Sequence, residues 1–225
     1  MPYPGEDTVF ENRHDAGRRL AAELGEYQDQ PVVVLAIPNG GVPVAVEVAG
    51  ALGAELGLVI SRKIPMPLHP EAGFGAIADS GNLILNDEVV RRLGLSRQQI
   101  EYEASKVRAE IKKRSLLYRG EEPPVSVTGR TAIIVDDGLA SGITMLAAVE
   151  SVRYRRPRAT VVAVPCASAM ALKQVERVAS RVVALTVGYM PTFYVSDFYR
   201  HWYDVSDNEV VQYLNQWRTR HHSPK

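Results

Sequence analysis

Short runs of consecutive Val, Ile, Leu and Ala recur along the chain, separated by segments whose apolar residues have helical spacing. Such runs are typical of strands buried on both faces, as in a parallel sheet. Strands that alternate with helices predict an α/β fold, a mostly parallel sheet flanked by helices. The predicted strands are 32–37, 58–61, 132–135, 160–164 and 182–185, and the predicted helices around them are 15–24, 42–52, 143–153 and 168–179.

The segment of about 75–120 breaks this alternation and is expected to be a largely helical insertion. It opens with two apolar stretches that flank Ser80 and Gly81, a pattern that predicts a hairpin. Cap signals then mark two helix starts. The predicted elements are strands 75–78 and 83–85, a helix of 86–94 begun by Asn86 and ended by Gly94, and a helix of 96–118 begun by the capping box Ser96–Gln99.

The C-terminal region repeats the capping-box pattern at Ser206 and Glu209, which predicts a closing helix over 210–217. Residues 221–225 are expected to be a frayed end. The chain shows no internal repeat and no low-complexity linker. We therefore expect a single domain over residues 1–225.

Composition excludes several classes of protein. The 225 residues include 26 basic residues (Lys and Arg) and 26 acidic residues (Asp and Glu). There is thus no basic excess of the kind that indicates binding to nucleic acid, although residues 112–114 and 153–158 form basic clusters. One cysteine, Cys166, excludes an internal disulfide framework and a four-cysteine metal site; we expect it to be a small buried residue. The most apolar stretch, 31–46, is interrupted by prolines and glycines, and the N-terminus has no signal-like run. A cytoplasmic protein without membrane partners is expected.

The segment 132–144 carries the strongest chemical signal. A buried strand runs into Asp136 and Asp137, and a loop containing Gly138 and Gly142 follows before a helix begins. Such a loop and helix start present backbone N–H groups to an anion such as phosphate. The two carboxylates would repel that phosphate but can accept hydrogen bonds from sugar hydroxyls. The combination predicts a site for a ribose 5-phosphate group; the alternative is a tight turn whose acids cap the helix.

Residues 133–144, with the sequence IIVDDGLASGIT, resemble the phosphoribosyl pyrophosphate (PRPP) motif of type I phosphoribosyltransferases, with Ser141 in place of the usual first Thr. Further stretches resemble a free-standing, poorly characterised bacterial and archaeal subgroup of that family, over roughly residues 10–215. These stretches are 10–13, 16–17, 40–45, 62–63, 118–119, 198–199 and 205–210. The resemblance implies a type I phosphoribosyltransferase fold, which consists of the sheet, the insertion and a small hood at about residues 186–217.

The resemblance also implies roles for individual residues. Asp136 and Asp137 would hold the ribose hydroxyls, with Asp137 the better candidate for the carboxylate near the reacting carbon. The 5′-phosphate would be bound by Gly138, Leu139, Ala140, Ser141, Gly142, Ile143 and Thr144, and pyrophosphate by Asn39, Gly40, Gly41, Arg62 and Lys63. Arg62 and Lys63 would share in catalysis by neutralising the leaving group.

Three features of the expected pyrophosphate side stand apart. In this family the loop at Pro38–Gly41 often contains a non-proline cis peptide. Asn39 stands where the subgroup is expected to have Arg, which removes a cation. Residues 64–75, rich in Pro and Gly, match the mobile catalytic loop, and His69 or Glu71 on it could assist proton transfer.

The base pocket and the metal are less sharply marked. Aromatic faces suited to stacking a base come from Tyr189, Phe193 and Tyr194, next to Ala167, although these residues fit packing of the hood equally well. Mg²⁺ is implied as an ion carried by PRPP, with Asp136 or Asp137 as the candidate protein ligand and no dedicated metal cage. A homodimer is expected.

The reaction implied is displacement of pyrophosphate from PRPP by a ring nitrogen or similar nucleophile. Two alternatives remain open. One is a non-catalytic PRPP or nucleotide sensor on the same fold, which Asn39 favours. The other is a phosphohydrolase that acts on ribose phosphates.

Overall fold

A computed structural model describes residues 9–66, 69–190 and 192–221. Its main sheet has five strands in the order β2-β1-β6-β7-β8, and all four neighbouring pairs are parallel. This confirms the predicted mostly parallel sheet. The strands are β1 Val32–Ala36, β2 Glu55–Leu58, β6 Thr131–Val135, β7 Ala159–Ser168 and β8 Arg181–Gly188.

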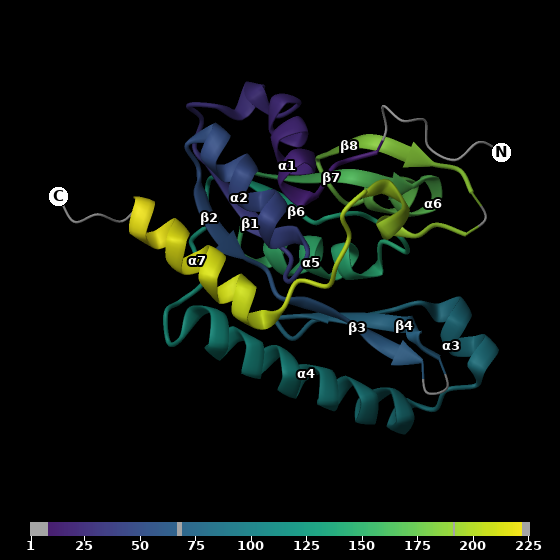
Figure 1. Ribbon diagram of the computed structural model, residues 1–225. Helices are drawn as coiled ribbons and strands as arrows, with labels where there is room; N and C mark the ends of the chain where they lie inside the picture. Colours follow the sequence, from purple (N-terminus) through teal and green to yellow (C-terminus); the bar gives the residue numbers. More distant parts are fainter. Residues whose placement is uncertain (1–8, 67–68, 191, 222–225) are drawn as a thin grey trace.

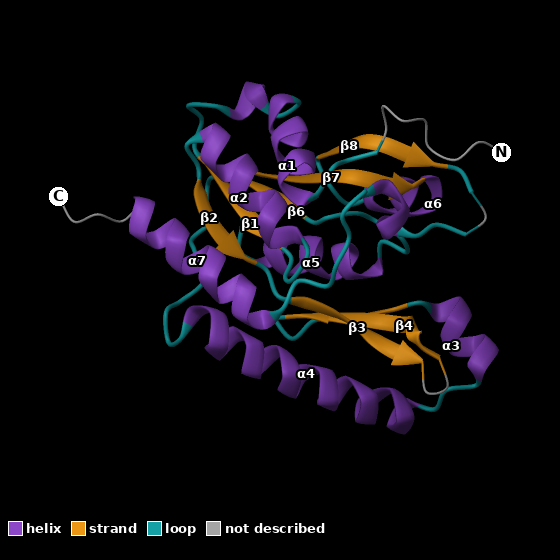
Figure 2. Ribbon diagram, in the orientation of Figure 1, coloured by secondary structure: helices purple, strands orange, loops and turns teal. Residues whose placement is uncertain are grey.

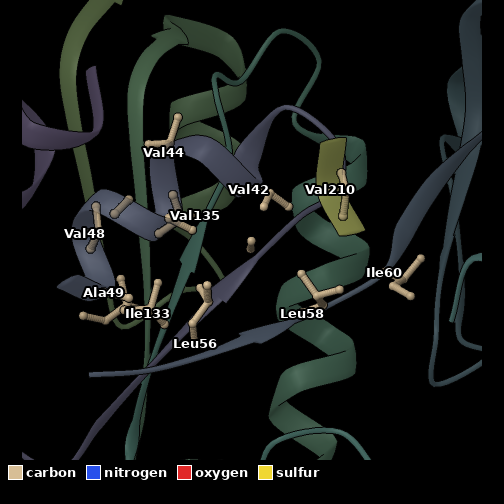
Figure 3. Packing of buried hydrophobic residues seen from close by; sticks show 14 of the residues in the cluster. Val42, Val44, Val48, Ala49, Leu56, Leu58, Ile60, Ile133, Val135 and Val210 are labelled. Atoms are coloured by element: carbon tan, nitrogen blue, oxygen red, sulfur yellow. The ribbon is translucent and has the colours of Figure 1, made fainter. Parts of the chain in front are cut away.

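Helices cover both faces of this sheet because alternate strand residues point to opposite sides. Val32 and Val34 face a core shared with α1 (Arg13–Ala22) and α2 (Gly41–Leu52). Figure 3 shows how α2 packs on this face, together with Val210 from the C-terminal helix. On the opposite face, Val33 and Leu35 pack with α5 (Ile143–Tyr154) and α6 (Ala169–Val175).

A second, antiparallel sheet lies beside the main one (Figures 1 and 2). It has the order β3-β4-β5 and is followed by two helices, the longer of which runs along its outer side. The predicted hairpin and both capped helices are confirmed. The elements are β3 Ser61–Met66, β4 His69–Ala78, β5 Leu83–Leu85, α3 Asp87–Leu93 and α4 Arg97–Arg119.

The predicted strand 58–61 is wrong in its bounds. The main-sheet strand ends at Leu58, residues 59–60 cross over, and Ser61 begins the second sheet. Val59 and Ile60 are fully buried, so the apolar run continues through the crossing and hides it in the sequence. The elements outside the main sheet therefore begin at Ser61 and not near residue 75.

The C-terminal segment runs from the end of β8 back across the molecule and ends in a helix (Figure 1). It contains a short 3-10 helix, η3 (Val195–Phe198), an extended stretch of residues 199–206, and α7 (Asp207–His221). The capping box at Ser206 and Glu209 is confirmed, and α7 is longer than predicted, whereas α6 ends four residues earlier, at Val175. A second 3-10 helix, η2 (Gly25–Tyr27), follows α1. The frayed end lies mostly outside the described residues, and the single-domain division stays a prediction.

Within the described residues, none of the helices combines the length and the apolar character needed to cross a bilayer.

Candidate functional site

Asp136 and Asp137 lie directly after β6, where the loop that follows β1 meets them. A Cβ atom at Gly40 would collide with the Asp137 carboxylate, and one at Gly41 would lie 2.7 Å from the carbonyl oxygen of Val135. Both positions therefore require glycine, because no side chain fits between the two loops. The peptide bond between Pro38 and Asn39 is cis, as the resemblance implied. The structure thus brings the predicted pyrophosphate loop and the acid pair into contact.

Two helices begin at this place without a side-chain cap. The N-caps of α2 and α5 are Gly40 and Gly142, and neither helix start receives a side-chain hydrogen bond from the described residues. The other five described α-helices begin on a side chain that accepts from the first turn: Asn12, Asn86, Ser96, Ser168 and Ser206. An uncapped start leaves the positive end of the helix dipole for an anion, and at α5 it leaves the first N–H groups as well. At α2 the Gly41 and Val42 amides already donate to the Ile37 and Asn39 carbonyls, both at 3.1 Å.

Backbone contacts with β7 hold the loop of residues 138–144. The Leu139 amide donates to the Cys166 carbonyl at 2.9 Å, and the Ser168 amide donates to the Leu139 carbonyl at 2.8 Å. The Ser168 hydroxyl donates to the Ala140 carbonyl at 2.7 Å. These bonds use the Leu139 amide but leave Ser141 exposed at the start of α5. The amides from Ala140 onward are therefore the ones suited to a phosphate, while that of Leu139 is not.

The acid pair sits in a setting that disfavours charge. Burial and the neighbouring charge of Asp137 raise the pKa of Asp136 well above its usual range. Burial also raises the pKa of Asp137, although the Arg13 guanidinium acts against that rise. Cys166, fully buried as expected, has its thiol pKa raised by burial and is no nucleophile. Two adjacent half-buried acids are unfavourable for the fold, which favours a binding role for them over a mere helix cap.

Arg13, which no sequence motif marked as functional, is bound to the acid pair. Its Nε donates to Asp137 Oδ2 at 2.9 Å, and its Nη1 donates to the Tyr203 carbonyl at 2.8 Å. The guanidinium carbon lies 3.9 Å from the centroid of the Trp202 ring. The Tyr199 hydroxyl donates to the Asp137 carbonyl at 2.6 Å. The extended stretch 199–206 therefore reaches the site from the C-terminal part of the chain.

The side chain of Asn39 makes its hydrogen bonds outside the two glycine loops, which are residues 38–41 and 138–144. Its amide donates to the Val205 carbonyl and to Asp207 Oδ1, both at 2.9 Å. Its oxygen accepts from Arg114 Nη1 at 2.7 Å and lies 3.1 Å from the Tyr118 hydroxyl. These contacts satisfy the amide group, so pyrophosphate could meet this residue only through its backbone.

Arg62 and Lys63 lie on β3 of the second sheet, so they do not follow the end of a main-sheet strand, as the predicted strand 58–61 would have placed them. Neighbouring residues on a strand point to opposite faces, so the pair cannot act as one cationic cluster. Arg62 pairs with Glu110 at 3.2 Å and lies in the field of Arg114 and Asp207, which joins it to the Asn39 network. Burial and the nearby Arg114 lower its pKa. Lys63 is exposed.

The remaining predicted residues are more scattered. Ala167 is fully buried in the core, and Phe193 packs against Phe198 with ring centroids 4.9 Å apart, whereas Tyr189 and Tyr194 are exposed. This arrangement fits packing of the C-terminal part better than a shared base pocket. His69 and Glu71 lie on β4, but their side chains, like residues 67–68 of the predicted lid, lie outside the described residues.

Four surface cavities, of about 400, 440, 620 and 650 Å³, lie on other parts of the molecule. Their lining contains none of the predicted site residues that the structure describes. The candidate site is therefore defined by its loops, acids and helix starts rather than by one of these cavities.

Comparisons with known proteins show which family the chain belongs to. The model of the phosphoribosyl transferase domain family matches residues 7–193. Proteins of two Mycobacterium tuberculosis strains, each named "Putative phosphoribosyl transferase", are 38% identical over 208 residues, 92% of this chain and 47% of their own length. The crystal structure of TT1426 from Thermus thermophilus has a TM-score of 0.77 at 38% identity and covers 93% of this chain and 99% of that one.

The chain belongs to the phosphoribosyl transferase domain family, since the family match covers most of it. It spans about half the length of the curated relatives it matches, 47%.

Proposed function

We propose that the chain binds PRPP and transfers its 5-phosphoribosyl group to a nitrogen of an acceptor base. The bond from the anomeric carbon to the pyrophosphate oxygen breaks, a carbon–nitrogen bond forms, and pyrophosphate leaves with the electron pair. The observation that carries this proposal is that two helix starts without a side-chain cap meet at one half-buried acid pair, with glycines packed against both acids. One helix start suits each of the two phosphate groups, and the acids between them suit the sugar.

The sugar phosphate has its counterpart in the loop after β6. The 5′-phosphate is assigned to the amides of residues 140–144, with the hydroxyls of Ser141 and Thr144 as further donors. The ribose hydroxyls are assigned to Asp136 and Asp137, which precede that loop and can accept from them.

Pyrophosphate has its counterpart in the loop after β1. The Gly41 amide already donates to the Ile37 carbonyl at 3.1 Å. Pyrophosphate is therefore assigned to the amides of Asn39 and Gly40, with Gly41 giving room for its close approach. Arg114 and Arg62 lie beside this loop with their positive charges. Cations beside a leaving group stabilise the charge that develops on it.

The acid pair fits a metal ion only if the ligand supplies most of the oxygens. Asp137 is engaged by Arg13, and no cluster of three acidic, His or Cys side chains suited to a metal occurs among the described residues. Mg²⁺ commonly binds through substrate phosphates, waters and few carboxylates, so an ion carried by PRPP suits this donor set. When bound, it would neutralise charge on pyrophosphate.

The proposal is tested by pyrophosphate release from PRPP and Mg²⁺ over a panel of purine and pyrimidine bases. Release that depends on one base, with formation of the matching nucleotide, supports it. Phosphate release without any base would instead indicate a hydrolase. The acceptor base, a homodimer and a cytoplasmic location are parts of the same proposal, and light scattering coupled to gel filtration measures the oligomeric state.

A second candidate function is a PRPP or nucleotide sensor on the same fold. The observation that favours it is Asn39, whose side chain is occupied by Val205, Asp207, Arg114 and Tyr118 and carries no charge. Binding of PRPP without turnover for every base in the panel would support the sensor over the transferase.

A further inference from the structure

Arg13 is a buried cation that reaches the acid pair from outside both glycine loops. Its side chain is 5% exposed, and it pairs with Asp137 across 124 positions of sequence. We propose that Arg13 is a positioning residue of the sugar site, holding the Asp137 carboxylate so that its other oxygen meets a ribose hydroxyl. This inference rests on the proposed function, because it takes the acid pair as the ribose site.

The place of Arg13 is fixed by how α1 begins and packs. The Asn12 side chain accepts from the Asp15 amide at 3.0 Å, which starts the helix at Arg13. One turn later, a Cβ at Gly17 would lie 2.8 Å from the Val44 carbonyl oxygen, so α1 lies directly against the backbone of α2. The helix that carries Arg13 is thereby held on the helix that starts at the site.

The guanidinium itself is held on several sides. Trp202 stacks on it, Nη1 donates to the Tyr203 carbonyl, and Nε donates to the Asp137 carboxylate. The backbone carbonyl of Asp137 accepts from Tyr199. Because side chain and backbone of the acid are both fastened, the carboxylate has little freedom to turn away. A preorganised acceptor binds a hydroxyl with less loss of conformational entropy.

The contacts of Asp137 also decide which oxygen faces the ligand. Oδ2 is bound by Arg13 and lies against Gly40, where even a Cβ would collide with it. Oδ1 is the oxygen that Arg13 does not hold, so a ribose hydroxyl that reaches it meets Asp137 beside the carboxyl group of Asp136, which hydrogen-bonds to the same side chain. A buried ion pair adds little net stability compared with apolar residues of similar size. Stabilisation of the fold is therefore a poor explanation for placing Arg13 beside Asp137.

The test compares the affinity for ribose 5-phosphate with that for inorganic phosphate, both by titration calorimetry on the full chain. The ratio reports the contribution of the sugar, which a merely structural defect would not change selectively. We expect Arg13→Gln to lower this ratio by about tenfold and to leave phosphate affinity near the wild-type value, since a charge-assisted hydrogen bond is disrupted. Arg13→Lys should keep more of the ratio, because an ammonium retains the charge beside Asp137.

The control is Arg19→Gln on the same helix, where the arginine is 45% exposed and pairs with Asp15 at 3.0 Å; its ratio should equal that of the wild type. An unchanged ratio in Arg13→Gln, or equal weakening of both ligands, would overturn the inference. If that variant does not fold, Arg13→Lys decides: a ratio about threefold lower or more supports the inference, and an unchanged ratio overturns it. A wild-type chain that binds ribose 5-phosphate no tighter than phosphate contradicts the proposed function itself.

Discussion

Two glycine loops start helices at the same edge of the main sheet, one after β1 and one after β6. The first carries Asn39, whose side chain is fastened to α4 and to the C-terminal part. The second is fastened by its backbone to β7 and leaves Ser141 exposed. Both loops combine glycines with a helix start, yet different parts of the chain hold them in place. The first loop depends on distant parts of the chain, whereas the second is formed by its local sequence and one neighbouring strand.

The largest effect is expected where the two loops meet. Asp136→Asn combined with Asp137→Asn should weaken PRPP binding by more than about 100-fold, since each charge-assisted hydrogen bond contributes roughly 1.5–3 kcal/mol. Titration calorimetry measures the affinity, and circular dichroism checks that the fold is kept. The matched control is Asp87→Asn with Glu88→Gln, an adjacent acid pair in the first turn of α3. Unchanged affinity in a folded double variant would remove the ribose assignment.

A methyl group should affect the two loops unequally. Gly40→Ala forces a Cβ against Asp137, and we expect a loss of about 3 kcal/mol in the free energy of unfolding. Gly142→Ala meets only Ala171 at 3.1 Å but must adopt a φ of 75°, which costs about 1–2 kcal/mol. Gly25→Ala, with nothing within 4 Å of its Cβ, is the control. Chemical denaturation measures all three, and an equal loss at positions 40 and 142 would contradict the contact between the loops.

Removal of a polar side chain should also change the free energy of unfolding by unequal amounts in the two loops. Asn39→Ala removes the hydrogen bonds to α4 and α7, so we expect the free energy of unfolding to fall by about 2 kcal/mol. Ser141→Ala should change it by less than about 0.5 kcal/mol, as for an exposed residue, and weaken phosphate binding instead. Asn208→Ala, at an exposed position on α7, controls for Asn39. A larger stability loss at Ser141 than at Asn39 would reverse the comparison.

The smallest expected effect is a gain in stability. Burial and the charge of Asp137 raise the pKa of Asp136, so the folded chain holds a proton that the unfolded chain releases. Stability therefore falls as pH rises from the ordinary value of 3.8 toward the raised pKa. Asp136→Asn should be about 1 kcal/mol more stable than wild type above that raised pKa.

The gain in Asp136→Asn should vanish below pH about 4, where both states of the wild type are protonated. Thermal unfolding over a pH series measures it, with the exposed Asp204→Asn as control. A gain that grows on acidification would show that Asp136 is not destabilised as a buried charge.

Much of the fold could be predicted from local patterns. Four of the five main-sheet strands, the hairpin and the capping boxes at Ser96 and Ser206 depend on residues near one another in sequence. The crossing at Val59 and Ile60 could not be seen, because an apolar run looks the same within a buried strand and between two sheets. The phosphate loop was equally local, since strand, acids, glycines and helix follow one another within 132–144.

The rest of the site depends on contacts that no local pattern encodes. Arg13 meets Asp137 across 124 positions, and Asn39 meets Asp207 across 168. Stretches 10–13, 118–119 and 205–210 matched the family in sequence, but nothing in their spacing indicated that Arg13, Tyr118 and Asp207 converge on the two loops. In the sequence, Arg62 and Lys63 are adjacent and look like one cationic pair. Only their placement on β3 shows that strand alternation turns the two side chains to opposite faces.

Both loops should bind one and the same ligand, and an NMR titration of the isotope-labelled chain with PRPP and Mg²⁺ measures this residue by residue. The amide signals of Asn39 and Gly40 and those of residues 140–144 should shift together and saturate with one dissociation constant. Shifts confined to one loop, or centred on another part of the molecule, would contradict the account.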